Sequence, residues 1–152
     1  MLQYAIVLPA GSGKSTLSSK YDFLIDIDSL HTPEFREELK LKYNETLKTG
    51  NWELYNKLEC NWILPKISNF PSNYVLLVHC HEKANILNLK ILGSFKPAYN
   101  IIKNVAKNRG KERGNLTIHN WETVINSKIL DSHNDIENEV LKCINEINKA
   151  NQ

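Results

Sequence analysis

A short apolar run that ends in a glycine-rich loop is the feature that most constrains this chain. Tyr4 to Leu8 has the pattern of a buried strand, and residues 11–16 follow it with the sequence Gly-Ser-Gly-Lys-Ser-Thr. Lys14 to Lys20 then suits a short helix. The glycines let the backbone curl so that successive N–H groups point inward, next to the positive end of a helix. The spacing therefore predicts a phosphate-binding loop between a strand and a helix.

Each residue type in this loop suits the binding of a nucleoside triphosphate. Lys14 would reach the terminal phosphates, and the hydroxyl of Ser15 would bind Mg²⁺. The residues expected to hold the nucleotide are Ala10, Gly11, Ser12, Gly13, Lys14, Ser15 and Thr16. The usual pattern G-x-x-x-x-G-K-[ST] begins with a glycine, and this chain has Leu8 there. Because of that departure, an alternative stays open: the protein binds a nucleotide but does not transfer phosphate.

Further strands and helices alternate along the chain. Strands are expected at 23–27, 74–78 and 89–95. Helices are expected from Pro33 to Gly50, from Trp52 to Pro65 and from Pro97 through 106, then around 121–129 and 136–147, with a basic loop at 109–115. This alternation predicts a single domain, residues 1–152, with a three-layer α/β fold and a parallel sheet. About ten residues separate the strands near His79 and Leu89, so the connecting helix must be very short or one strand is misassigned.

Composition excludes several classes of protein. The chain has 152 residues and a formal net charge of +2, which does not suggest a dedicated nucleic-acid binder. Its three cysteines show no paired spacing, which favours the reducing cytoplasm over an oxidising compartment. We see neither a signal peptide nor an apolar stretch of the ~18 residues that span a bilayer, so no membrane partner is expected. The heavy use of Asn, Lys and Ile is typical of AT-rich genomes, those of phages among them.

The loop at 8–16, the Asp26-Ile27-Asp28 run after the second strand and the segment from Pro97 to Ile129 together resemble the nucleoside/nucleotide kinase group of P-loop proteins. Within that group the chain looks most like the kinases of polynucleotide ends and the shikimate and gluconate type. The resemblance implies ATP and Mg²⁺ as cofactors. It also implies a lid at about 109–118, between two helices.

The resemblance places Asp26 and Asp28 opposite the γ-phosphate. One carboxylate would hold Mg²⁺ and the other would accept the proton of an attacking hydroxyl. We expect Asp26, with Ser15, to bind the metal and Asp28 to face the acceptor, although the residues alone do not rank the two. Neighbours two apart on a strand share a face, so both can point at one site. The alternative is a cap cluster for the helix after Ser29.

The chain has only three arginines, Arg36, Arg109 and Arg113, and otherwise uses lysine. The planar fork of arginine suits phosphate better than lysine does. By resemblance, Arg109 and Arg113 would clamp the transferring phosphoryl group together with Lys14, and Arg36 would contact the acceptor. The alternative for all three is a solvated surface position.

Two weaker features stay open. His79-Cys80-His81 ends a predicted strand, where histidines or Glu82 can line the active cleft, but the spacing is poor for a metal site. Trp52, Tyr55 and Trp62 can stack an acceptor base, although their helical spacing more often indicates core packing.

The sequence thus predicts an ATP-dependent phosphotransferase acting on a small acceptor. A nucleoside, a nucleotide or a nucleic-acid end all fit, and a long polynucleotide is disfavoured by the low net charge. The competing interpretation is a regulatory NTP-binding or NTPase module that is not a kinase. The oligomeric state is not readable from the sequence.

Overall fold

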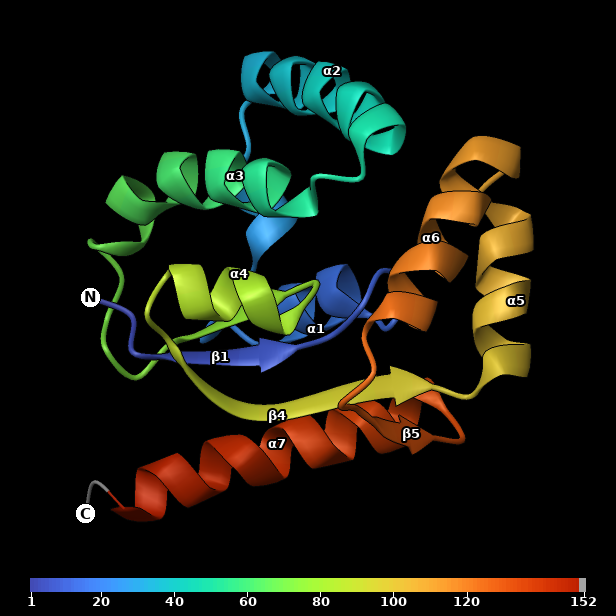
Figure 1. Cartoon of the computed structure of the whole chain (residues 1–152). Coiled ribbons are helices and arrows are strands. Elements are labelled where there is room, and N and C mark those ends of the chain that lie inside the picture. Colours follow the sequence, from blue (N-terminus) through green and yellow to red (C-terminus); the bar gives the residue numbers. More distant parts are fainter. Residues whose placement is uncertain (151–152) are drawn as a thin grey trace.

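The computed structural model describes residues 1–150 and builds them around a five-stranded parallel sheet (Figure 1). The strands are β1 (Tyr4–Val7), β2 (Leu24–Asp26), β3 (Val75–Val78), β4 (Lys90–Pro97) and β5 (Lys128–Leu130), in the spatial order β2-β3-β1-β4-β5. All four pairings are parallel. The carboxyl ends of the strands therefore share one edge of the sheet, where α/β proteins place their ligands.

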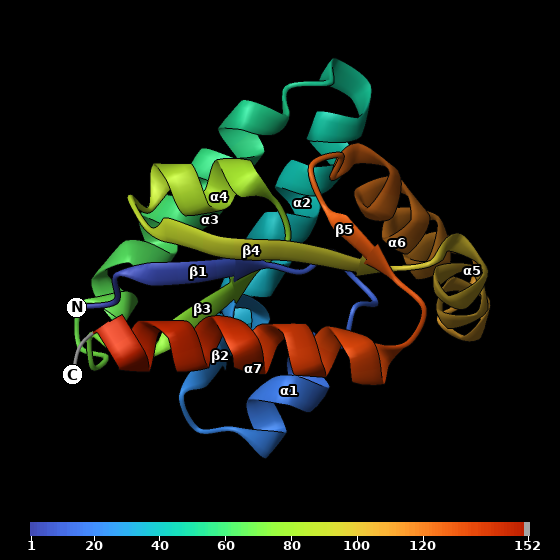
Figure 2. The ribbon, with the colours of Figure 1, turned by 90° about the horizontal axis from the view of Figure 1, so that it is seen from below.

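Helices cover both faces of this sheet, which confirms the predicted three-layer α/β/α sandwich. Helices α3 (Trp52–Ile67) and α4 (His81–Ile86) lie on one face, and α1 (Lys14–Lys20) and α7 (His133–Ala150) lie on the other (Figures 1 and 2). In β1, Ala5 and Val7 pack toward the α3 side and Ile6 packs toward α7, all with 0% exposure. Burial on both faces explains why the central strands are apolar throughout.

Three further helices lie outside the central layers. Helix α2 (Pro33–Thr49) packs on α3 and begins at Thr32, whose Oγ1 accepts a hydrogen bond from the Phe35 N–H at 3.2 Å. Helices α5 (Tyr99–Asn108) and α6 (Lys111–Thr123) form a hairpin beyond the carboxyl ends of the strands (Figure 1). A short 3₁₀ helix, η1 (Ile27–Leu30), follows β2. No helix in residues 1–150 is both long and apolar enough to cross a membrane.

The expected end of a helix at Pro65 was wrong, because α3 continues to Ile67. Proline removes one backbone hydrogen bond but does not forbid a last turn. Ile63 and Ile67 lie on either side of Pro65 and are both fully buried against the sheet. Burial of this face outweighs the lost bond.

The expected loop at 109–115 was also wrong, since only Arg109 and Gly110 lie between α5 and α6. Gly110 has a positive φ of 85°, which glycine adopts without strain and which reverses the chain in two residues. Pro97 ends β4 and does not open α5, which begins at Tyr99.

The expected helix over 121–129 was wrong as well, because α6 ends at Thr123 and residues 128–130 form β5. The Lys96 ammonium donates to the carbonyls of Trp121 at 2.8 Å and Val124 at 2.9 Å, and so caps the end of α6.

The short connection after His79 is α4, of six residues. It joins β3 to β4 past the intervening β1, so both strand assignments hold.

Candidate functional site

The glycine loop leaves β1 and curls into the first turn of α1. Gly11 and Gly13 adopt positive φ angles of 85° and 99°, and the Ser12 N–H donates to the Pro9 carbonyl at 3.0 Å. Among residues 1–150, no hydrogen bond uses the backbone N–H of Lys14, Ser15 or Thr16. The loop therefore presents a helix N-terminus with free amides, which is an anion-binding arrangement.

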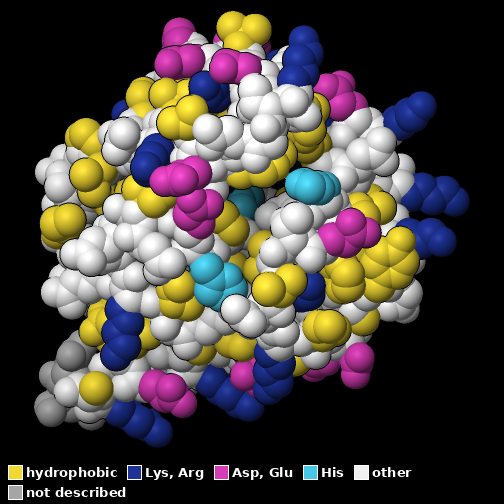
Figure 3. Space-filling view, viewed as in Figure 1, with side chains coloured by type: hydrophobic (Ala, Val, Ile, Leu, Met, Phe, Trp, Pro, Cys, Tyr) yellow, Lys and Arg dark blue, Asp and Glu magenta, His cyan; other side chains and the backbone are white. Residues whose placement is uncertain are grey.

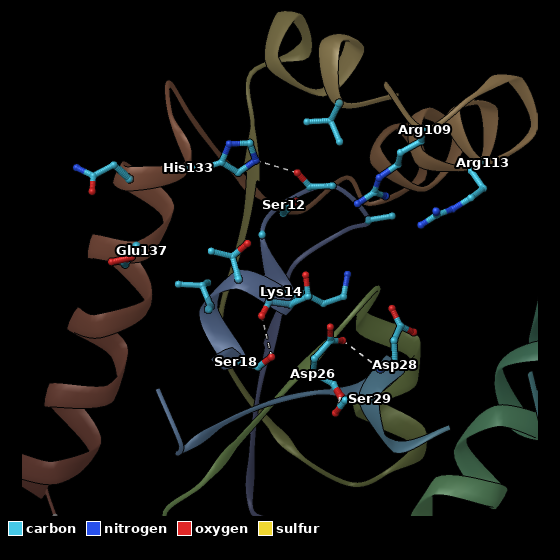
Figure 4. Close-up of a pocket in the computed structure, with 18 of the residues that line it drawn as sticks. Ser12, Lys14, Ser18, Asp26, Asp28, Ser29, Arg109, Arg113, His133 and Glu137 are labelled. Atoms are coloured by element: carbon cyan, nitrogen blue, oxygen red, sulfur yellow. Dashed lines mark hydrogen bonds between the residues drawn. The ribbon is translucent and has the colours of Figure 1, made fainter. Parts of the chain in front are cut away.

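Lys14 lies at the centre of this loop and is only 6% exposed. Its ammonium donates to the Leu8 carbonyl at 3.2 Å. Burial lowers the pKa of Lys14, and the nearby carboxylates of Asp28 and Asp26 act against that shift. Figure 4 shows the Lys14 side chain pointing into the space above both carboxylates. A cation so placed is electrostatically suited to terminal phosphate oxygens.

Asp26 and Asp28 reach the same cavity by different backbone routes. Asp26 is the last residue of β2, whereas Asp28 lies in the first turn of η1, so the strand pattern does not extend to Asp28. The Asp26 Oδ1 accepts the Asp28 N–H at 3.0 Å and thereby caps η1. Burial, and then the charge of Asp28, raise the pKa of Asp26. The capping alternative named the helix after Ser29 and was wrong, because that helix is α2 and Thr32 caps it; Asp26 caps η1 instead, and its carboxylate also lines the cavity.

A buried chain of charged and polar groups leads away from Asp28. The His79 Nε2 lies 3.1 Å from the Asp28 Oδ2, and the His79 Nδ1 lies 2.9 Å from the Lys83 ammonium. Lys83 in turn contacts both carboxylate oxygens of Glu59, at 3.0 and 3.3 Å. The side chains of Lys83 and Glu59 are 6% and 2% exposed. This network of side chains links η1, the residue that follows β3, α4 and α3.

The protonation states along this chain follow from its geometry. Burial acts to lower the pKa of Lys83, but the Glu59 carboxylate outweighs it and raises that pKa. Because the ammonium donates to Nδ1 of His79, the imidazole proton resides on Nε2 and is donated to Asp28. Burial lowers the pKa of His79, which agrees with a neutral ring. Burial alone would raise the pKa of Asp28, but His79, Lys14 and Lys83 lower it below its usual range.

The three arginines lie around the same cavity. Arg109 and Arg113 extend from the turn between α5 and α6 and from the start of α6 toward the loop (Figure 4). Arg109 is oriented by a 3.1 Å hydrogen bond from its Nη1 to the Thr117 Oγ1. Arg36 on α2 donates from Nη2 to the Asp28 carbonyl at 3.3 Å. The loop residues, both carboxylates and all three arginines predicted from the sequence therefore line one cavity.

This cavity has a volume of about 860 Å³ and is called the nucleotide cavity below, after the ligand proposed for it in the next subsection. The loop forms its floor, and α5, α6 and the start of α7 form its walls (Figure 4). Three lining residues at the start of α7 were not predicted from the sequence, namely His133, Asn134 and Glu137. The His133 Nε2 lies 2.9 Å from the Gly11 carbonyl and ties α7 to the loop.

Asn120 was also missed. Its Oδ1 accepts the Ala10 N–H at 2.6 Å, and its Nδ2 donates to the His79 carbonyl at 3.3 Å. One side chain of α6 thus joins the loop after β1 to the end of β3. An asparagine one turn from a helix end gives no sequence signal of such a role.

Two groups of oxygen and nitrogen ligands lie at or next to the nucleotide cavity. Asp28, Glu59 and His79 bring ligand atoms within 4.8 Å of one another, but the Lys83 ammonium already contacts Glu59 and His79. That group is neutralised internally and does not fit a cation. Ser15 and Asp26 fit better, because both line the nucleotide cavity and one Asp26 oxygen makes no hydrogen bond within residues 1–150. A hydroxyl and a carboxylate are oxygen ligands of the kind that Mg²⁺ prefers.

A second cavity of about 790 Å³ lies between α3, α4 and α6. It meets the nucleotide cavity at Ala10 and Asp28, which line both.

Comparison with protein-family models gives no match for this chain, and neither does comparison with the sequences of curated proteins. The site itself is therefore the basis for assigning a function.

Proposed function

We propose that this protein is an ATP-dependent phosphotransferase that moves the γ-phosphate of ATP to a small acceptor. One observation carries the proposal. A glycine loop with free helix amides, a buried lysine, two carboxylates and three arginines converge on a single cavity, and Asp28 also lines a second cavity beside it. This combination supports phosphoryl transfer, which depends on positioning and on stabilisation of negative charge.

Each part has a role in this proposal. The loop amides and Lys14 bind the β- and γ-phosphates, and Arg109 and Arg113 bind the phosphoryl group as it transfers. Ser15 and Asp26 would hold Mg²⁺, which would neutralise phosphate charge when bound. Asp28 accepts the proton of the acceptor hydroxyl. Asp28 is placed for this role because His79 holds one of its oxygens at 3.1 Å, and its lowered pKa keeps the carboxylate ionised and able to accept a hydrogen bond from that hydroxyl.

Support for a transferase over a simple NTPase comes from the second cavity. A module that only binds or hydrolyses a nucleotide needs no further concave site next to the γ-phosphate position. Here a cavity of about 790 Å³ opens at Asp28, the residue proposed as the base. A lone hydrolytic water would need far less room.

The test is ADP release with ATP, Mg²⁺ and a panel of hydroxyl-bearing acceptors, measured for the native chain and for Lys14→Ala. We expect acceptor-stimulated ADP release that the substitution abolishes. Lys48→Ala is the matched control, because Lys48 is an exposed lysine in the last turn of α2. Its activity should equal that of the native chain.

Thermal unfolding of Lys14→Ala, compared with that of the native chain, tests whether the variant remains folded. Equal turnover in native and Lys14→Ala proteins would refute the proposal. ADP release that depends on Lys14 but is never stimulated by any acceptor would favour the regulatory NTPase.

A further inference from the structure

The second cavity has aromatic walls from three helices. Tyr43 on α2, Trp52 and Tyr55 on α3 and His119 on α6 all line it. Their ring centroids lie 5.6 to 6.0 Å apart in the pairs that contact each other. The three Tyr and Trp side chains are half-buried and His119 is exposed, so these rings border a hollow and do not fill a core. Figure 3 shows this hollow, with histidine side chains in it and around its rim.

The charges around this cavity exclude one kind of ligand. Lys83 is the only lysine or arginine among its described lining residues, and it is committed to Glu59 and His79. The lining also includes the carboxylates of Asp28, Glu59 and Glu82. All three arginines line the nucleotide cavity instead. A phosphate group in the second cavity would meet acidic groups and no free cation, so the cavity favours an uncharged ligand.

Polar groups between the rings can bind the edge of a heteroaromatic ring. Asn56, Asn120 and Asn126 line the cavity together with Glu82, and Asn56 Nδ2 donates to Glu82 at 2.7 Å. Amides and carboxylates supply both donors and acceptors, whereas the faces of Trp52 and Tyr55 supply stacking surface. A sugar acid would bring its own carboxylate next to those of Asp28, Glu59 and Glu82, whereas the flat face of an uncharged base can stack on the rings.

We propose that the second cavity binds the phosphoryl acceptor as an uncharged nucleoside, with its base among Tyr43, Trp52, Tyr55 and His119 and its hydroxyl at Asp28. This inference rests on the proposed function, since it identifies the acceptor of that reaction. The hydroxyl oxygen forms a bond to the γ-phosphorus of ATP as the bond from that phosphorus to the β–γ bridging oxygen breaks. ADP leaves with the bridging oxygen, and the hydroxyl proton passes to Asp28 and then to water.

The test separates binding from transfer. Calorimetry without ATP measures the Kd of the four common ribonucleosides and deoxynucleosides for the native chain, Trp52→Leu and Tyr99→Leu. Loss of base stacking on one aromatic side chain costs about 1–3 kcal/mol, so we expect Trp52→Leu to weaken nucleoside binding by about 5- to 150-fold. Tyr99 is 47% exposed on α5 and lines neither cavity, so Tyr99→Leu should bind as the native chain does.

Turnover assays then measure ADP release with nucleosides, nucleoside monophosphates, sugar acids and short oligonucleotides that carry a free 5′-hydroxyl. We expect the KM for the nucleoside to rise in Trp52→Leu while the KM for ATP stays unchanged. The acceptor nucleoside can be free or can be the unphosphorylated end of a strand, because both carry the same ring and hydroxyl. The ratio of their kcat/KM values distinguishes these two acceptors. Either source supports an uncharged nucleoside unit at this cavity.

Three outcomes would overturn the inference while leaving phosphotransfer intact: transfer only to monophosphates, transfer only to acceptors without an aromatic ring, or an unchanged nucleoside Kd in Trp52→Leu. Failure of the proposed function looks different. In that case nucleosides bind with the expected dependence on Trp52, but no ADP is released in a manner that depends on Lys14.

Discussion

The Nε2 of His79 donates a hydrogen bond of 3.1 Å to the Oδ2 of Asp28, and the proton on that nitrogen is fixed by Lys83 on the far side of the ring. The imidazole is thus a rigid donor and not a base. It holds the carboxylate at the junction of the two cavities, where Asp28 lines both. His79 is therefore a positioning residue in the proposed reaction, and Asp28 is the residue that contacts the acceptor.

Substitutions of Asp28 and His79 should distinguish the proton-accepting role of Asp28 from the positioning role of His79. Asp28→Asn removes the proposed base and should lower kcat by about 10²–10⁴-fold. His79→Ala should lower kcat by about 10- to 100-fold, because the carboxylate stays but loses its orientation. His79→Gln can still donate to Asp28 through its amide and should recover part of that loss. Rates measured at saturating ATP and acceptor give each kcat.

Asp22→Asn is the control for this series, because Asp22 is exposed at the opposite end of β2. Its kcat should match that of the native chain. A His79→Ala variant with native kcat would contradict the positioning role, as would a His79→Gln variant no better than His79→Ala.

The buried pair of Lys83 and Glu59 predicts a large effect on stability. Removing one partner of a buried ion pair leaves the other charge unpaired and costs about 3–5 kcal/mol. Lys83→Met should lower the free energy of unfolding by about that amount, because Glu59 is only 2% exposed. The double variant Lys83→Met/Glu59→Gln should recover much of it. Urea unfolding curves with equal slopes would give these differences directly. If the double variant lost the sum of the two single-variant losses in free energy of unfolding, then Lys83 and Glu59 would not stabilise each other.

Acid should destabilise the fold through the same carboxylate. Burial acts to raise the pKa of Glu59, but Lys83, and His31 after it, lower the pKa to about 2 from a usual value of 4.5. A carboxylate with a depressed pKa in the folded state stabilises the fold above its unfolded pKa, and this stabilisation is lost as the pH falls. The window runs from about pH 4.5 to about pH 2, and the loss for this one group amounts to about 3 kcal/mol.

Unfolding free energies measured between pH 2 and pH 6 test this window. Glu59→Gln should be less stable than the native chain at pH 6, with a shallower fall below pH 4.5. If the variant and the native chain lose stability in parallel, then Glu59 does not carry the pH dependence.

The parts of the fold that were predictable have their signals in adjacent residues. Thr32 and Pro33 encode the start of α2 and Gly50 its end, and both bounds are as expected. The glycine loop is equally local, since two positive φ angles and a helix start suffice to build it. Such elements can be read from short windows because no distant contact decides them.

The parts that were missed depend on distant contacts. β5 carries half-exposed and exposed side chains at the edge of the sheet, so it shows neither an apolar run nor an alternating pattern, and only its pairing with β4 defines it. Glu59 interrupts the apolar face of α3 at a buried position, and this could have signalled a buried partner. Its partner Lys83, however, is 24 residues away on a six-residue helix, and only the assembled fold brings the two together.

The close contact between α5 and α6 gives a last prediction about the arginines. A Cβ on Gly114 would collide with the backbone carbonyl of Ala106, so an alanine there would force the two helices apart. Overpacking of this kind costs about 1–3 kcal/mol. Displacement of α6 would also move Arg113, and Asn120 would lose its 2.6 Å bond to the Ala10 N–H. Gly114→Ala should therefore weaken ATP binding as well as lower the melting temperature.

Asn115→Ala provides the comparison, because Asn115 is the next residue on α6 and is exposed. Calorimetric titration with a non-hydrolysable ATP analogue should give a native Kd for Asn115→Ala and a higher Kd for Gly114→Ala. Amide hydrogen exchange would locate the cause, since the Ala10 N–H should exchange faster only in Gly114→Ala. If Gly114→Ala lowered stability but kept both the native Kd and slow exchange at Ala10, then α6 would pack on α5 without holding the phosphate loop.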